Sequence, residues 1–182
     1  MLTITANFDA LERFGNRLQH AKRSLPANLA KVVHQVGPEA TNNMKRVLPE
    51  QTGLKFKTIN KALKGRPQGA RYEIVSKGGD IRLKFFAPRE TSKGVSAAPW
   101  NARRVYPSTF INAGWWPKRT GPVRGKDNVW RREGRSKYPI KAVRSGLFIP
   151  NEMVTGKSAV VFYGTVNAKL GAAVEKIIFA GL

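Results

Sequence analysis

Few side chains in this chain are of the types that carry enzyme chemistry. Cysteine is absent, which excludes disulfides, thiolate nucleophiles and zinc sites built on cysteine. The two histidines, His20 and His34, have no carboxylate near them in sequence that would suggest a catalytic dyad or a metal site. A metal-dependent nuclease needs convergent carboxylates, and Glu73, Asp80 and Glu133 would have to meet from separate strands. The residue types therefore predict a protein that is not an enzyme and holds no metal or cofactor.

Positive charge is the strongest signal in the composition. The 182 residues include 33 Lys and Arg against 11 Asp and Glu, which gives a formal net charge of +22. A surface with this excess attracts polyanions, and nucleic acid is the usual counter-charge, bound through phosphate neutralisation and counterion release. An acidic partner subunit would satisfy the same charge, and composition does not separate the two.

The basic residues are the candidate functional residues. Between Arg103 and Arg144 there are twelve Lys and Arg but only two acids, Asp127 and Glu133. The cations are spread over predicted helices, loops and strands, which favours contact with a nucleic-acid backbone over sequence reading by one helix. The residues expected to face nucleic acid are Lys55, Lys57, Lys61, Lys64, Arg103, Arg104, Lys118, Arg119, Arg124, Lys126, Arg135 and Lys137.

Two adjacent tryptophans, Trp115 and Trp116, lie among four of these cations. Aromatic rings between cations can stack on bases or follow a nucleic-acid backbone. They can also anchor their loop against the same domain or a neighbouring subunit. We favour anchoring, because a pair of solvent-exposed tryptophans invites aggregation. Trp115 and Trp116 are therefore expected to form a subunit-contact loop.

Composition also limits the class of protein. An apolar content of 41% fits a folded protein, and this length fits one domain with a core or one domain plus a long arm. No apolar run approaches the roughly 20 residues of a membrane-spanning helix, and the N-terminus lacks the basic start and apolar block of a secretory signal. No membrane partner is expected, and the lack of cysteine fits assembly in a reducing host cytoplasm.

Apolar residues at helical spacing predict that residues 1–64 are helical. The first stripe begins at Phe8 and ends at residues 24–26, Ser-Leu-Pro, where the proline starts a second helix. The second stripe crosses Gly37-Pro38 in phase, which favours a kink over a break. Residues 52–53, Thr-Gly, open a third, shorter and basic helix. A helix-turn-helix is disfavoured, because proline and glycine loosen the turn between the second and third helices.

From residue 70 the apolar period changes to two, which predicts strands. Residues 72–75 and 81–85 flank Lys-Gly-Gly-Asp, a favourable hairpin turn because glycine accepts positive φ. A further strand at 108–113 and a strand pair over 128–143 complete the sheet. Two segments rich in glycine, proline and charge, 87–103 and 114–127, are predicted to be long loops.

Alternation along the strand predicted at 128–133 limits how many of its cations share one surface. Successive side chains of a strand point to opposite faces of the sheet. Arg131 and Arg132 are therefore expected to point apart, and at most one of them can join a single basic surface.

Helical spacing returns near the end of the chain, and predicts a helix over residues 158–180. The chain is therefore predicted to be a single α+β domain over residues 1–182. Its N-terminal helices and C-terminal helix would pack on one mainly antiparallel β-sheet, at 70–145, with the two long loops projecting from it.

The order of features in the second half resembles the minor tail protein Z family of tailed phages. The family has a P-x-x-F-I strand, found here at Pro107–Ile111, and an R-x-G-x-S-x-Y-P-I strand pair, found here at 132–140. A corner at 145–153 follows, although Leu147 stands where the family has proline. The N-terminal half also resembles that of the family, in which a long helix ends and leads into a basic helix. The residues that carry this likeness are Arg46, Leu48, Thr52, Gly53, Leu54 and Lys55. The resemblance covers roughly residues 25–153.

The resemblance implies a structural virion protein, a tail-completion or neck component at the head–tail junction. Such a protein would form a ring at the head-proximal end of the tail and face the DNA channel. Six-fold tail symmetry implies a hexamer. The expected partners are other copies of the chain, neighbouring proteins such as the tail terminator, stopper or portal-side connector, and the packaged DNA end.

Two alternatives belong to other classes of protein. A free, non-sequence-specific nucleic-acid-binding protein of a host or mobile element explains the charge equally well but leaves the strand pair and corner unexplained. It would bind DNA as a monomer or dimer with a steep salt dependence. A ring component would bind other tail or neck proteins. A metal-dependent nuclease, the third hypothesis, predicts cleavage of plasmid DNA with Mg²⁺ or Mn²⁺.

Overall fold

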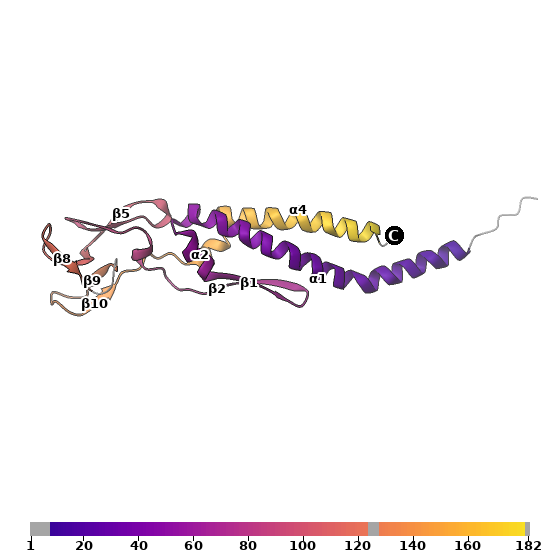
Figure 1. Cartoon of the computed structure of the whole chain (residues 1–182), viewed down its shortest axis with the longest axis horizontal. Helices are drawn as coiled ribbons and strands as arrows, with labels where there is room; N and C mark the ends of the chain where they lie inside the picture. Colours follow the sequence, from indigo (N-terminus) through magenta and orange to yellow (C-terminus); the bar gives the residue numbers. More distant parts are fainter. Residues whose placement is uncertain (1–7, 124–127, 181–182) are drawn as a thin grey trace, which may run out of the picture. The chain divides into compact units, whose positions relative to one another are not determined.

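The computed structural model describes residues 8–123 and 128–180, which form an α+β fold of helices and small antiparallel sheets (Figure 1). The predicted α+β class is confirmed. The helices of the described residues are α1 (Phe8–Thr52), α2 (Phe56–Ala62), α3 (Ile149–Met153) and α4 (Gly156–Ala180), with two 3₁₀ turns, η1 (Leu83–Phe85) and η2 (Pro99–Asn101).

The strands pair into small separate sheets in place of the single sheet that the sequence predicted. The sheets have the orders β1–β2, β3–β4–β5, β10–β9–β6 and β7–β8. Most strands are only two to four residues long, so each sheet ends after a few cross-strand pairs. Their bounds are β1 Leu63–Gln68, β2 Arg71–Ser76, β3 Arg89–Thr91, β4 Gly94–Ala97, β5 Arg104–Pro107, β6 Thr109–Phe110, β7 Asn112–Gly114, β8 Arg119–Pro122, β9 Trp130–Arg132 and β10 Ile140–Ala142.

The chain divides into two compact units whose segments alternate along the sequence, whereas the sequence predicted one domain over residues 1–182. The first unit contains the described residues up to Asn42, Gly65–Ile74 and the described residues from Phe162 onward. The second contains Asn43–Lys64 and Val75–Val161. Helices α1 and α4 each contribute residues to both units.

In the first unit, two glycines leave room for one aromatic ring. A Cβ atom on Gly37 of α1 would overlap the ring of Tyr72, and a Cβ on Gly65 would overlap its hydroxyl end. Tyr72 of β2 therefore fits between the backbone of α1 and the backbone of β1. Within this unit, Lys169 of α4 pairs with Glu39 of α1, so the two helices lie side by side there (Figure 1).

Helix α1 is continuous across both prolines that the sequence marked. The predicted helix boundary at residues 24–26 is wrong, and the predicted continuation across Gly37-Pro38 is confirmed. A proline inside a helix removes one backbone hydrogen bond and does not by itself end the helix. The third predicted helix is also present, as α2.

The second unit has its core where α1 ends. Met44, Leu48, Leu54 and Ile59 are buried there, together with side chains that follow in the chain: Leu63, Leu83, Phe86, Val95, Leu147 and Ile149. Glycine closes the helix end, because Gly53 has φ of 76° and donates its N–H to the carbonyl of Pro49 at 2.9 Å.

Several predicted strands and loops differ from the observed ones. Strand β2 pairs with β1, so the hairpin predicted around residues 77–80 is wrong. The segment 81–85 instead enters the 3₁₀ turn η1. The predicted loop at 87–103 contains β3 and β4, and the loop at 114–127 contains β8. The predicted strand pair over 128–143 is confirmed as β9–β10, and the C-terminal helix as α4.

Among the helices of the described residues, none combines the length and the apolar character needed to cross a bilayer.

Candidate functional site

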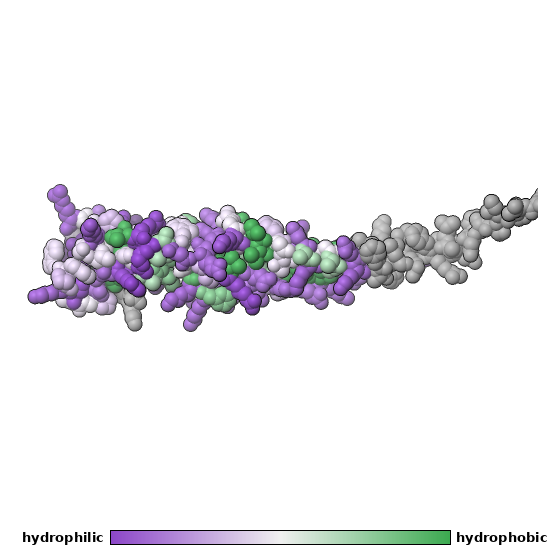
Figure 2. Space-filling model, turned by 90° about the horizontal axis from the view of Figure 1, so that it is seen from above, coloured by the Kyte–Doolittle hydropathy of each residue, from purple (hydrophilic) through white to green (hydrophobic). Residues whose placement is uncertain are grey.

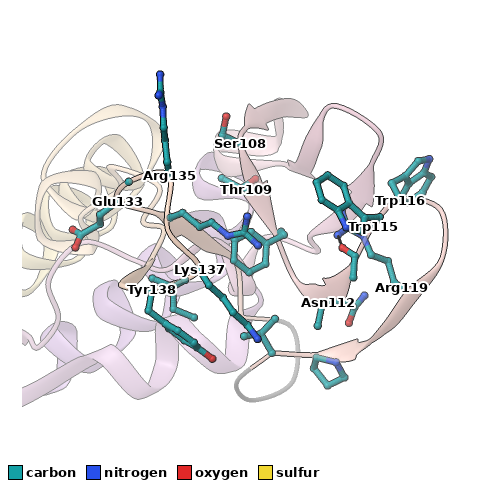
Figure 3. Close-up of a pocket in the computed structure, with 18 of the residues that line it drawn as sticks. Ser108, Thr109, Asn112, Trp115, Trp116, Arg119, Glu133, Arg135, Lys137 and Tyr138 are labelled. Carbon is teal, nitrogen blue, oxygen red and sulfur yellow. Dashed lines mark hydrogen bonds between the residues drawn. The ribbon is translucent and has the colours of Figure 1, made fainter.

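The candidate site is a groove of about 1010 Å³ within the second unit. Figure 3 shows its two walls, the β7–β8 hairpin with Trp115 and Trp116 and the β9–β10 turn with Lys137 and Tyr138. Strand β6 contributes Thr109 and Phe110 to the lining. The lining is therefore built from three segments, at 108–116, 119–123 and 132–140, together with Ser92.

The sheet β10–β9–β6 decides which basic side chains reach the groove. Arg131 lies opposite Lys141 on β10 and Thr109 on β6. The next residue, Arg132, lies opposite Ile140, and successive side chains of a strand point to opposite faces. Arg132 lines the groove and Arg131 does not, in agreement with the prediction that only one of the two joins a single surface. The Arg132 guanidinium lies 5.5 Å from the centre of the Phe110 ring.

A buried carboxylate fixes the other wall. Glu90 of β3 accepts hydrogen bonds from the backbone N–H of Ile111 at 2.6 Å and of Asn112 at 3.0 Å, and from the Asn112 side chain at 3.0 Å. Its Oε2 also lies 3.5 Å from Nε of Arg119. These contacts tie β3 to the start of β7 and to β8.

The same contacts set the charge state of Glu90. Burial raises the pKa of its carboxyl group, but the hydrogen bonds from Asn112 and Ile111 and the charge of Arg119 lower it by more. The net result is a pKa below the ordinary value of 4.5, so Glu90 is ionised at neutral pH. Arg119 is thus engaged in an internal ion pair, and its guanidinium also donates to the carbonyl of Gly114.

The aromatic residues of the groove are largely uncovered. Trp115 is 88% exposed, Trp116 is 48% exposed and Tyr138 is 55% exposed. The sequence favoured anchoring of Trp115 either against its own domain or against a neighbouring subunit. The first of these two predictions is therefore wrong. The β7–β8 hairpin closes through backbone pairing and through Arg119, and does not need the tryptophan ring as an anchor.

The cations on the β9–β10 turn are available to a ligand. Among the described residues neither Arg135 nor Lys137 has an acidic partner, whereas the one acid of the lining, Glu133, pairs with Lys141 at 3.3 Å. In Figure 3 the Lys137 side chain extends into the groove and the Arg135 side chain points away from it. Lys118 is exposed on the opposite hairpin.

The remaining cations predicted from the sequence lie elsewhere or have other contacts. Lys55, Lys57, Lys61 and Lys64 are exposed on α2 and its flanks and do not line the groove. Arg103 donates to the carbonyls of Ser96 and Ala87, so it joins segments of its own unit. Arg124 and Lys126 lie outside the described residues.

Arg104 has an environment that the sequence did not indicate. Its guanidinium lies 5.8 Å from the Trp100 ring centre and 5.1 Å from that of Tyr106, and its Nε donates to the Tyr106 hydroxyl at 2.7 Å. Trp100 is itself held by Glu152, which accepts from the indole Nε1 at 2.8 Å. Arg104 is exposed but preorganised by these two rings.

The groove residues that were not candidates from the sequence include two aromatic residues and one cation: Phe110, Tyr138 and Arg132. The alternation along 128–133 was a usable signal for Arg132, since it separates Arg132 from Arg131. Phe110 and Tyr138 carried no such signal, because their place in the groove depends on pairing of β6 with β9.

The groove can bind a ligand through charge and ring contacts. Its lining offers cationic donors and exposed aromatic planes, with one carboxylate already paired. Across the described residues, no three His, Cys, Asp or Glu side chains gather in a way that would hold a metal ion. The chain matches no protein-family model, no curated protein and no solved structure.

Proposed function

We propose that this chain is a structural virion protein of a tailed phage, a tail-completion or neck component that forms a ring at the head-proximal end of the tail. The observation that carries the proposal is the pairing of the segments that resemble the Z family. Pro107–Ile111 contributes β6, and the 132–140 segment spans the turn between β9 and β10. In one sheet, Phe110 lies opposite Trp130, and Arg132 lies opposite Ile140.

The charge supports a position next to DNA. A ring of protomers with a formal charge of +22 each would create a strongly positive collar. Such a collar holds a DNA end through phosphate contacts, without reading its sequence. The exposed lysines of α2 and its flanks are the residues that we assign to this backbone contact: Lys55, Lys57, Lys61 and Lys64.

A ring at the head-proximal end of the tail would have two kinds of partner, other copies of the chain and neighbouring virion proteins. Six-fold tail symmetry favours a hexamer, and the ring would contact neighbouring tail and neck proteins such as a terminator, stopper or portal-side connector. A ring buries part of each protomer against its neighbours, which would also cover exposed apolar side chains of the second unit such as Val105, Phe148 and Val154. Figure 2 shows hydrophobic residues, in green, at the surface of the face in view.

Deletion of the gene from the phage that encodes it tests the proposal. We expect heads and tails to accumulate without joining into infectious particles, and expression of the wild-type chain from a plasmid to restore joining. Normal, infectious particles from the deletion strain would overturn the assignment. The favoured alternative would then be a free, non-sequence-specific nucleic-acid-binding protein, for which the exposed lysines of α2 provide the surface.

A further inference from the structure

The groove has aromatic faces that the described residues of its own unit leave largely exposed. Trp115 is the most exposed of the large apolar side chains described, at 88%, and Tyr138 on the opposite wall is 55% exposed. Exposed rings of this size cost free energy in water, because apolar surface remains hydrated. A ligand with flat, stackable groups would cover them.

The charges around these rings have one sign. Arg132 and Lys137 line the groove without an acidic partner among the described residues, and Lys118 follows the tryptophans on the hairpin. The lining acid, Glu133, is paired with Lys141, and Arg119 is neutralised by Glu90. The ligand that complements this lining is therefore anionic as well as flat.

We propose that the groove binds single-stranded nucleic acid, with a base stacked on Trp115 and phosphates held by Lys137 and Arg132. Bases in a duplex are stacked on one another, so their faces are closed to a protein ring. Unpaired bases expose these faces, and grooves that combine cations with aromatic rings hold single strands without sequence preference. An acidic protein segment would satisfy the cations but would leave the two tryptophan faces without a stacking partner. The inference rests on the groove alone and does not depend on the virion assignment.

Binding of fluorescein-labelled oligothymidylate of about 15 nucleotides, a length within the site sizes of such grooves, provides the test. Fluorescence anisotropy of the full chain is compared for this strand and for a duplex of equal length. We expect the single strand to bind more tightly than the duplex. We expect Trp115→Ala to weaken single-strand binding by about tenfold, as for the loss of one base stack, and Trp115→Phe to retain most of the affinity.

A matched variant controls for the loss of an exposed ring. Tyr163 is 59% exposed on α4 and does not line the groove. Tyr163→Ala should leave single-strand affinity unchanged, and thermal unfolding of each variant shows whether it is folded. Because Trp115 is almost fully exposed, its replacement should leave the melting temperature at the wild-type value.

A second pair of variants tests the cations. Lys137→Gln should lower the salt dependence of single-strand binding by about 0.7 in the slope of log K against log salt, as expected when one phosphate is no longer neutralised. Lys157→Gln removes the same charge from an exposed position on α4 outside the groove. It should change the slope by much less.

Three results would overturn the inference. Equal affinity for the duplex and the single strand would show that both bind through the net positive charge and not through base stacking in the groove. An unchanged affinity in folded Trp115→Ala, with loss of self-association, would make the hairpin a subunit contact. Displacement of the strand by polyglutamate with the same dependence on Trp115 would make the groove a site for an acidic protein segment. None of these results bears on whether deletion blocks the joining of heads and tails, so the two proposals fail separately.

Discussion

Glu90 is the side chain on which one wall of the groove depends. It accepts three hydrogen bonds from Ile111 and Asn112 and pairs with Arg119, while only 8% of its side chain is exposed. The carboxylate therefore holds the residues that lead into the tryptophan hairpin. A neutral group at this position would keep the shape and lose the charge.

Glu90→Gln is expected to lower the free energy of unfolding by about 2 kcal/mol at neutral pH, because an amide accepts these bonds less strongly and leaves Arg119 without its anion. The pKa of Glu90 is lowered on folding, so its contribution is complete above the ordinary carboxyl value of 4.5 and is lost as the pH falls through the lower folded value. Urea unfolding at several pH values measures both effects. A variant whose stability falls in acid by as much as that of the wild type would show that Glu90 is not the group responsible.

Asn101 caps the end of α1 from a strained position. Its side-chain amide donates to the carbonyl of Glu50 at 2.7 Å, and its φ is 58°, where asparagine is tolerated better than alanine. Asn101→Ala should cost about 2 kcal/mol through the lost hydrogen bond and the backbone strain, and Asn101→Gly should cost about 1 kcal/mol through the hydrogen bond alone. Thermal unfolding ranks the two variants, with Asn167→Ala, at an exposed position on α4, as the control. Equal losses of stability in Asn101→Ala and Asn101→Gly would show that backbone strain at this position does not contribute.

The packing of helix α1 can be tested with its own glycines. Gly37 and Gly15 are both inside α1, but only Gly37 has a neighbour, the ring of Tyr72, where a Cβ would lie. Gly15→Ala should raise the free energy of unfolding by about 0.5–1 kcal/mol, since alanine is the better helix former. Gly37→Ala should lower it by about 1–3 kcal/mol, because the ring must move. Stabilisation by both changes would mean that Tyr72 does not pack against Gly37.

The elements that the sequence predicted well are those whose signal is local. The helix at 158–180 and the strand pair over 128–143 have clear periods, and both are present. The strand predicted at 81–85 is wrong. Its apolar residues alternate as in a strand, but the buried residues Leu83 and Phe86 are three residues apart, as in a helical turn. Strand β4 was missed because its buried residues Val95, Ser96 and Ala97 are small and include a polar one.

The groove could be predicted only in part, for a related reason. Its lysines and tryptophans were visible in the composition of 114–137, and the alternation of β9 separated Arg131 from Arg132. The residue that fixes its wall was not visible, because Glu90 is 21 residues away from Ile111 in sequence and reaches it only in the folded unit. The sequence predicted that Arg119 faces nucleic acid, because its ion pair with the distant Glu90 forms only in the folded unit.

The net charge of the chain leads us to predict salt-dependent binding of duplex DNA, independent of the groove. Substitution of Lys57, Lys61 and Lys64 by glutamine should reduce the salt slope for duplex DNA by about 0.9 for each phosphate that is no longer neutralised. A control substitutes Lys31, Lys157 and Lys176, which are also exposed, and removes the same total charge. Anisotropy of a labelled duplex over a range of salt concentrations gives both slopes. Equal reductions in the two variants would show that duplex DNA senses net charge and not the α2 surface.

Cryo-electron microscopy of the intact phage particle, focused on the head–tail junction, tests the proposed ring most directly. We predict a ring of this chain around the channel, with the α2 lysines facing the channel. Absence of the protein from purified, complete particles would contradict the tail-completion proposal and would favour the free nucleic-acid-binding protein.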